Sequence, residues 1–254
     1  MTQTCLLIPA IQVISSLINV IITLKIHQTG NHMKKNNTFQ AIIFDMDGLL
    51  IDSEKMYYQT FAALAEKYGA EFTLEEYTAG FSGRSLKENI QGLIDMFTLP
   101  VTLDEAYVIV TDYLSNYDLR TIMLKPGARE LIRYLKHNQV KVCLATSGNE
   151  KRARTILRIH GLETMFDAMA FKEDISNGKP APDIFLKVCE KGGLSARDCL
   201  VLEDSEAGIL AAERAGMKVI CIPDLKYPGE EYAGIAWRIL PDLYAVKELL
   251  EEER

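Results

Sequence analysis

A run of four apolar residues, 41–44, is followed at once by the segment Asp45-Met46-Asp47-Gly48, and this junction constrains the fold more than any other part of the chain. A short apolar run that ends near a glycine predicts a buried strand of a parallel sheet, closed by a sharp turn. Asp45 and Asp47 would then leave the carboxyl end of that strand. In open α/β sheets, ligands bind at this end of the strands. The junction therefore predicts a site built on two carboxylates.

From residue 127 onward, short apolar runs alternate with segments of helical periodicity. We expect strands near 140–145, 168–171, 199–202, 219–222 and 237–240, and helices near 127–138, 150–160, 182–191, 206–215 and 243–250. Strand–helix alternation predicts a parallel sheet with helices on both faces. The expected fold class is therefore α/β, with a Rossmann-like parallel sheet core.

The segment after the first strand shows helical patterns and no strand-like run up to residue 123. Tyr57, Phe61 and Leu64 recur at helical spacing, and two further helical patterns follow at 86–97 and 103–114. We expect residues 53–124 to form an inserted α-helical domain. The core domain then comprises residues 33–52 and 125–254, and the Pro-Gly pair that follows Lys125 marks the return to it.

The first 32 residues need a separate interpretation. Residues 1–24 carry no charged side chain, and 6–24 are mostly aliphatic, which is long enough to span a membrane. Pro9 and several polar residues interrupt this run, and the basic start and cleavage site of a signal peptide are missing. We expect Met33 to begin a soluble protein and residues 1–32 to be an upstream extension. A membrane anchor is the alternative.

Charge and cysteine content narrow the classes of partner and compartment. The net charge of −7 argues against a nucleic-acid partner, because such partners usually need a basic face. The five cysteines are scattered and form no CxxC pair, so neither a disulfide framework nor a zinc site is indicated. Cys143, Cys199 and Cys221 lie within apolar runs and are expected in the core. A reducing compartment, the cytoplasm, fits best, and nothing in the sequence implies a protein partner.

A hydroxyl-bearing motif follows the strand expected at 140–145. Thr146, Ser147 and Asn149 would place hydroxyl groups and backbone N–H groups where a strand turns into a helix, which suits a phosphate group. An ordinary helix N-cap is the alternative for Ser147 or Asn149.

Two further motifs are charged. Lys179 lies on a loop stiffened by Pro180 and Pro182, although an isolated lysine of this kind is often a solvated surface residue. Glu203 and Asp204 end the apolar strand at 199–202, where their charges could simply favour the next helix N-terminus. Because all four motifs fall at strand ends on one edge of one sheet, we expect them to form a single site.

These four motifs, in this order from about residue 41 to the C-terminus, resemble those of the haloacid dehalogenase superfamily. The likeness is to its helical-cap members, which include β-phosphoglucomutase and small sugar- or nucleoside-phosphate phosphatases. The resemblance implies that Asp45 is the nucleophile, Asp47 the general acid/base, Thr146 the phosphate-binding hydroxyl and Lys179 a charge-balancing cation. It also implies that the inserted helical domain is a cap.

The resemblance implies a cofactor and a substrate site as well. The implied ion is Mg²⁺, with Asp45, Asp47, Glu203 and Asp204 as its ligands. The implied substrate-binding residues are Thr146, Ser147 and Asn149 in the core, and Gly83, Arg84 and Ser85 in the cap.

The predicted function is a Mg²⁺-dependent phosphatase that cleaves a small phosphomonoester, such as a sugar phosphate or nucleoside monophosphate. Phosphoryl transfer needs positioning and charge neutralisation, and an aspartyl-phosphate on Asp45 would split it into two easier steps. A β-phosphoglucomutase-like mutase is the alternative. Those mutases carry a cap histidine twelve residues after the nucleophile, where this chain has Tyr57, so the phosphatase is favoured. Phospho-accepting receivers are shorter and lack an inserted cap. Dehalogenases of the superfamily lack an acid at the position of Asp47.

Overall fold

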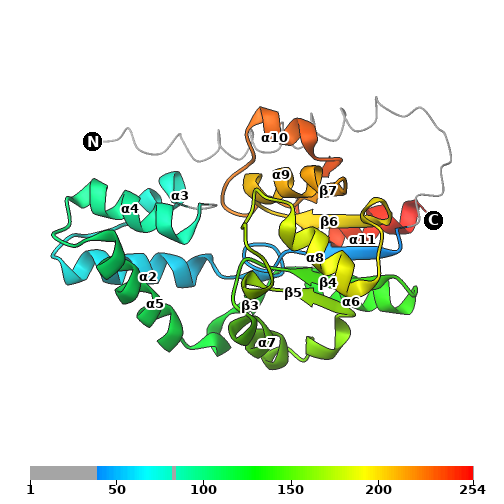
Figure 1. The fold of residues 1–254 in the computed structure, drawn as a ribbon, viewed down its shortest axis with the longest axis horizontal. Coiled ribbons are helices and arrows are strands. Elements are labelled where there is room, and N and C mark those ends of the chain that lie inside the picture. Colours follow the sequence, from blue (N-terminus) through cyan, green and yellow to red (C-terminus); the bar gives the residue numbers. More distant parts are fainter. Residues whose placement is uncertain (1–38, 82–83, 254) are drawn as a thin grey trace, which may run out of the picture. The chain divides into compact units, whose positions relative to one another are not determined.

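The computed structural model describes residues 39–81 and 84–253. Within them lies a six-stranded parallel sheet in the order β5-β4-β1-β6-β7-β8 (Figure 1). The strands are β1 (Ala41–Phe44), β4 (Lys141–Ala145), β5 (Ala168–Ala170), β6 (Cys199–Glu203), β7 (Lys218–Cys221) and β8 (Arg238–Ile239). The strand that precedes Asp45 is therefore central, and its neighbours are the strands that precede Thr146 and Asp204.

The helices of the core cover both faces of this sheet (Figure 1). They are α6 (Ala128–His137), α7 (Glu150–Ile159), α8 (Asp183–Gly192), α9 (Glu206–Arg214), α10 (Glu230–Ile235) and α11 (Leu243–Glu252). Ile42 and Phe44 pack in one apolar cluster with residues of α6, α7 and α11. Ala41 and Ile43 pack in a second cluster with residues of α8 and α9. Because side chains alternate along a strand, β1 is buried on both faces, as the apolar run predicts.

The inserted domain is a group of four helices with its own apolar cluster. They are α2 (Glu54–Lys67), α3 (Leu74–Gly80), α4 (Leu86–Phe97) and α5 (Leu103–Asn116). Phe61, Phe72 and Tyr77 contribute aromatic rings to its centre. The chain enters and leaves the domain through an antiparallel pair of short strands, β2 (Ile51–Asp52) and β3 (Met123–Leu124).

The helical patterns predicted α2, α4 and α5, and the strand–helix alternation predicted the core elements. The helices α3 and α10 and the strands β2 and β3 were not expected. A capping box between Thr73 and Glu76 starts α3, and this Thr-x-x-Glu spacing is a sequence signal for the helix. Strands of two residues are too short for any periodicity to reveal. The remaining elements are 3₁₀ turns at Leu119–Thr121, Glu163–Met165, Lys172–Asp174 and Ala196–Asp198.

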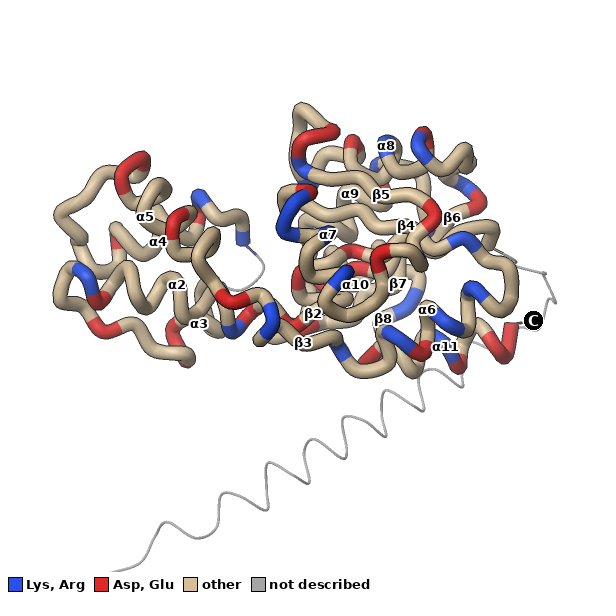
Figure 2. Tube along the Cα trace, turned by 90° about the horizontal axis from the view of Figure 1, so that it is seen from below, with Lys and Arg blue, Asp and Glu red and all other residues tan. Residues whose placement is uncertain are grey.

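Several other expectations concern the ends and the surface. The interpretation of residues 1–32, and with it Cys5, lies outside the described residues. Across 39–81 and 84–253, no helix is both long and apolar enough to cross a membrane. Cys143, Cys199 and Cys221 are fully buried in the core, as expected. Figure 2 shows both basic and acidic positions along α6, α8 and α11.

Candidate active site

Asp45 emerges at the end of β1, in the centre of the sheet. Its backbone N–H donates to the carbonyl oxygen of Leu202 at 3.0 Å, which continues the β1–β6 pairing up to Asp45. Its side chain is 9% exposed and accepts a short hydrogen bond from Nζ of Lys179. The same ammonium group donates to Oε1 of Glu203. The Lys179 side chain is only 8% exposed, so the surface interpretation of this lysine is wrong.

Glu203 is fully buried at the end of β6, and both of its oxygens have partners. Oε2 accepts from the backbone N–H groups of Asp204 and Ser205, each at 3.1 Å, and from Oγ of Ser205 at 2.9 Å. A Cβ atom at Gly208 would lie 1.9 Å from the Glu203 carboxyl carbon. Only glycine in the first turn of α9 leaves room for this carboxylate.

Thr146 follows β4 and lies in the loop before α7. It is 1% exposed, its N–H donates to the carbonyl of Ala170 at 3.1 Å, and its Oγ1 accepts from the N–H of Gly148 at 2.9 Å. Asn149 is the N-cap of α7, because its side chain accepts from the N–H of Arg152 at 2.8 Å. Ser147 is exposed. Hydrogen bonds to Ala170 and Gly148 therefore hold Thr146 in place. The Asn149 side chain caps α7, as the N-cap alternative predicted.

The main residue that sequence reasoning missed is Arg152. Its guanidinium binds Asp47 through two hydrogen bonds, Nη1 to Oδ2 at 2.9 Å and Nη2 to Oδ1 at 2.6 Å. Burial is the largest single effect on the pKa of Asp47 and raises it, but the charge and hydrogen bonds of Arg152, together with smaller contributions from other groups, lower it overall. The sequence did contain a signal for this contact. A basic residue in the first turn of a helix is unfavourable next to the positive end of the helix dipole, so its presence indicates an acidic partner nearby.

The remaining acids carry more negative charge than Lys179 can balance. Burial raises the pKa of Asp45 to about 7, with Lys179 opposing and Glu203 adding to this effect. Burial, Glu203 and Asp45 together raise the pKa of Asp204 well above its usual value. The carboxylates of Asp45, Glu203 and Asp204 thus share one ammonium group, and a bound cation would supply the missing positive charge.

The donor set fits a magnesium ion in part. Carboxylate oxygens of the kind that Mg²⁺ prefers are offered by Asp45 and Asp204. The Asp204 carboxylate lies against the turn after β1, since a Cβ at Gly48, where φ is +86°, would lie 2.2 Å from its Oδ2. Asp45 uses one oxygen for Lys179, whereas both oxygens of Glu203 and both oxygens of Asp47 already accept hydrogen bonds. Among the residues that the structure describes, no three His, Cys, Asp or Glu side chains gather closely enough to enclose a metal ion.

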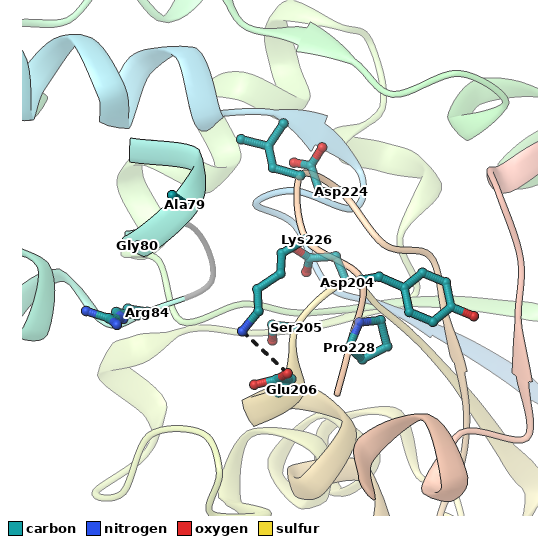
Figure 3. Close-up of a pocket in the computed structure, with 11 residues that line it drawn as sticks. Ala79, Gly80, Arg84, Asp204, Ser205, Glu206, Asp224, Lys226 and Pro228 are labelled. Carbon is teal, nitrogen blue, oxygen red and sulfur yellow. Dashed lines mark ion pairs between the residues drawn. The ribbon is translucent and has the colours of Figure 1, made fainter. Parts of the chain in front are cut away.

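A pocket of about 160 Å³ brings cap and core residues together (Figure 3). Arg84 and the end of α3 line it from the cap, and Asp204 and Asp224 line it from the core. Arg84 therefore shares a pocket with Asp204, a predicted metal ligand. Ser85 instead caps α4, accepting from the N–H of Glu88 at 3.3 Å. Gly83 lies outside the described residues.

The fold and the site together define a class: a Rossmann-like α/β enzyme with a helical cap and a buried aspartate at the end of its central strand. The chain belongs to the haloacid dehalogenase-like hydrolase family, whose sequence model matches residues 42–222. A "Phosphorylated carbohydrates phosphatase" of Thermotoga maritima is 34% identical, over 71% of this chain and 83% of the relative. A "Probable pseudouridine-5'-phosphatase" of Drosophila melanogaster is 33% identical, over 74% and 84%. A crystal structure of a provisionally named β-phosphoglucomutase from Thermotoga maritima has a TM-score of 0.69 at 29% identity, over 84% and 99%. The protein is a phosphoric monoester hydrolase.

Proposed function

We propose that the enzyme is a Mg²⁺-dependent phosphatase of small phosphorylated metabolites that works through an aspartyl-phosphate on Asp45. The observation that carries this proposal is the buried cluster of Asp45, Lys179 and Glu203 at the end of the central strand. Burying three charged groups together costs free energy. The cluster lies at the carboxyl ends of the strands, which is where ligands bind in open α/β sheets. An arrangement of this kind is expected of a nucleophile and its charge-balancing partners.

In the first half-reaction, an oxygen of Asp45 attacks phosphorus while the bond from phosphorus to the ester oxygen breaks. Asp47 gives its proton to the departing alcohol oxygen, which leaves as a neutral alcohol. The Thr146 hydroxyl and the N–H groups of its loop bind the phosphoryl oxygens, and the Lys179 ammonium offsets their negative charge.

In the second half-reaction, water attacks the phosphorus of the aspartyl-phosphate and Asp47 takes the proton of that water. The bond between phosphorus and Asp45 breaks, which restores the carboxylate and releases inorganic phosphate. Asp45 and Asp204 would hold the Mg²⁺ ion, with Glu203 and Asp47 beside it. When bound, the ion supplies positive charge that reduces the repulsion between the phosphate and the carboxylates.

We infer a sugar phosphate or a nucleoside monophosphate as the substrate, and the names of the two phosphatase relatives support both classes. The mutase alternative stands second. Tyr57 occupies the position of the mutase histidine, and it packs against both the core cluster and the cap cluster, so a phenol rather than an imidazole lies at the junction of cap and core.

The test is phosphate release from a panel of sugar phosphates and nucleoside monophosphates, with Mg²⁺ and with a chelator. Hydrolysis that requires Mg²⁺ and disappears in Asp45→Asn is the expected result. Isomerisation of a sugar phosphate, with no release of inorganic phosphate, would support the mutase instead. Activity that persists in Asp45→Asn would contradict the aspartyl-phosphate.

A further inference from the structure

Arg152 holds the acid/base residue Asp47 from the first turn of α7. The two side chains form a bidentate pair, with Nη1–Oδ2 at 2.9 Å and Nη2–Oδ1 at 2.6 Å. The Arg152 side chain is 12% exposed, and its Nε has no hydrogen-bond partner among the described residues. Buried N–H groups are usually paired, so this unpaired Nε does not explain where the guanidinium lies. The two Nη contacts with Asp47 hold it in place.

The pose of Asp47 suits accepting a proton rather than giving one. Both carboxylate oxygens accept from N–H groups that cannot act as acceptors, because a guanidinium has donors only. A protonated carboxyl would direct its O–H at these donors unless it rotated away. An ionised carboxylate has about four acceptor sites, and Arg152 uses two of them, which leaves room for a hydrogen bond from water. The Asp47 side chain keeps 22% of its surface exposed, so such a water can approach.

The pair also lies beside the loop that is expected to bind phosphate. An added Cβ at Gly148 would lie 3.2 Å from Oγ1 of Thr146, 3.4 Å from Nη1 of Arg152 and 3.6 Å from Oδ2 of Asp47. All three side chains therefore converge around one glycine. Asp47 is thus held next to the place where a phosphoryl group would be attached to Asp45.

We propose that Arg152 is a positioning residue that holds Asp47 as the general base of the second half-reaction. This inference rests on the proposed function. In that step, a water oxygen bonds to phosphorus as the bond to Asp45 breaks, and the proton of the water passes to Asp47. The first half-reaction, in which Asp47 gives a proton, requires the pair with Arg152 to open. Arg152 therefore speeds hydrolysis of the aspartyl-phosphate and does not assist its formation.

The experiment separates the two steps with 4-nitrophenyl phosphate, whose acidic phenol leaves without needing a proton. Rapid mixing of the full-length enzyme with this ester and Mg²⁺ measures the first release of nitrophenol and then the steady state. In Arg152→Met we expect the first release to stay within about threefold of wild type. The steady-state rate should fall at least ~100-fold, the lower range for loss of general base catalysis. The intact mass of acid-quenched enzyme should show phosphorylated protein accumulating in the variant.

Two further variants complete the design. Arg158→Met is the matched control, because Arg158 lies on the same helix but is 67% exposed and pairs with Glu163, so both rates should be unchanged. Arg152→Lys keeps the charge but loses the two-point contact, and we expect a steady-state rate between those of wild type and Arg152→Met. It also serves as the test variant if Arg152→Met fails to fold, which a thermal melt will show.

Each other outcome overturns the inference. Equal losses in the first release and in the steady state would place Arg152 on the phosphoryl group itself. Unchanged rates in Arg152→Met would make the pair purely structural. If wild-type enzyme hydrolyses no phosphate ester at all, the proposed function fails together with the inference, and this result differs from both of the others.

Discussion

The capping-box acids of the cap and two buried acids at the core site, Asp45 and Asp204, have pKa values that are shifted in opposite directions. In the cap, Glu76, Glu88 and Glu105 each sit in a capping box, where hydrogen bonds from the N-cap residue lower their pKa values. In the core, burial raises the pKa values of Asp45 and Asp204. A lowered pKa means that the ionised acid stabilises the fold at neutral pH, whereas a raised one means that it opposes folding. The capping-box acids thus stabilise the cap, whereas ionised Asp45 and Asp204 oppose folding, as expected of acids placed for chemistry.

The largest expected effect is that of Asp45→Asn, which should lower turnover by at least ~1,000-fold, because no nucleophile remains. Although this variant loses activity, it should not lose stability. The folded pKa of about 7 exceeds the usual 3.8, so the penalty on folding grows as pH rises above 3.8 and is complete above 7. Without metal, at about pH 8, the thermal midpoint of Asp45→Asn should therefore equal or exceed that of wild type.

The control for this variant is Asp112→Asn in the cap, where the acid accepts a hydrogen bond from the side chain of Asn116, on the same exposed helix surface. Both turnover and midpoint should match wild type. A clear fall in the midpoint of Asp45→Asn would show that Asp45 contributes to the stability of the core, and the comparison would then be wrong for this residue.

Gly208→Ala should have the next largest effect, and it tests how tightly the core holds Glu203. The added Cβ would lie 1.9 Å from the carboxyl carbon of Glu203, whose two oxygens are already bound. Overpacking of this kind costs about 1–3 kcal/mol, and displacement of Glu203 also disturbs Lys179. We expect a lower thermal midpoint and at least ~10-fold lower turnover.

The matched control is Gly234→Ala. Gly234 is also a helical glycine, in α10, and an added Cβ there meets no atom within 4 Å. Because alanine favours a helix over glycine by about 0.5–1 kcal/mol, this variant should be as stable as wild type or more stable. If Gly208→Ala were as stable and as active as Gly234→Ala, the carboxylate of Glu203 would be free to move.

The sequence predicted the central strand and the edge on which the site is built, because buried strands have continuous apolar runs and their ends carry the polar motifs. It did not predict the pairing of Arg152 with Asp47, which joins residues 105 positions apart. No periodicity encodes such a contact, since it depends on how α7 is set against the turn after β1. The same limit applies to the contacts of Glu203, whose oxygens accept from Lys179 and from the start of α9.

Arg84→Ala should have a smaller effect on activity, and it tests whether the cap selects substrates without acting on the phosphoryl group. Arg84 is exposed and lines the pocket from the cap, so it should contact the leaving group. Loss of one charged hydrogen bond, about 1.5 kcal/mol, should lower kcat/KM for the best substrate roughly tenfold. Hydrolysis of 4-nitrophenyl phosphate, with few cap contacts, should change much less.

Thr146→Val provides the contrasting case. Thr146 is buried in the loop after β4, and every substrate presents the same phosphoryl group to it. We therefore expect this variant to lower kcat/KM for all esters by a similar factor. If Arg84→Ala also lowered every ester equally, Arg84 would belong to the phosphate site, and the division between cap and core would not hold.

The smallest expected effect is that of Thr102→Ala in the capping box of α5. Oγ1 of Thr102 accepts from the N–H of Glu105 at 3.3 Å, and Oε2 of Glu105 accepts from the N–H of Thr102 at 3.0 Å. Loss of an N-cap of this kind should lower the thermal midpoint by roughly 2–4 °C and leave kcat/KM within about twofold of wild type. Thr111→Ala on the same helix is the control, because the Thr111 hydroxyl donates to carbonyls of the preceding turn and alanine is a better helix former. Its midpoint should stay the same or rise. If Thr102→Ala instead lowered turnover without changing the midpoint, a residue placed for stability would be controlling chemistry, and cap and core could no longer be treated as separate in their roles.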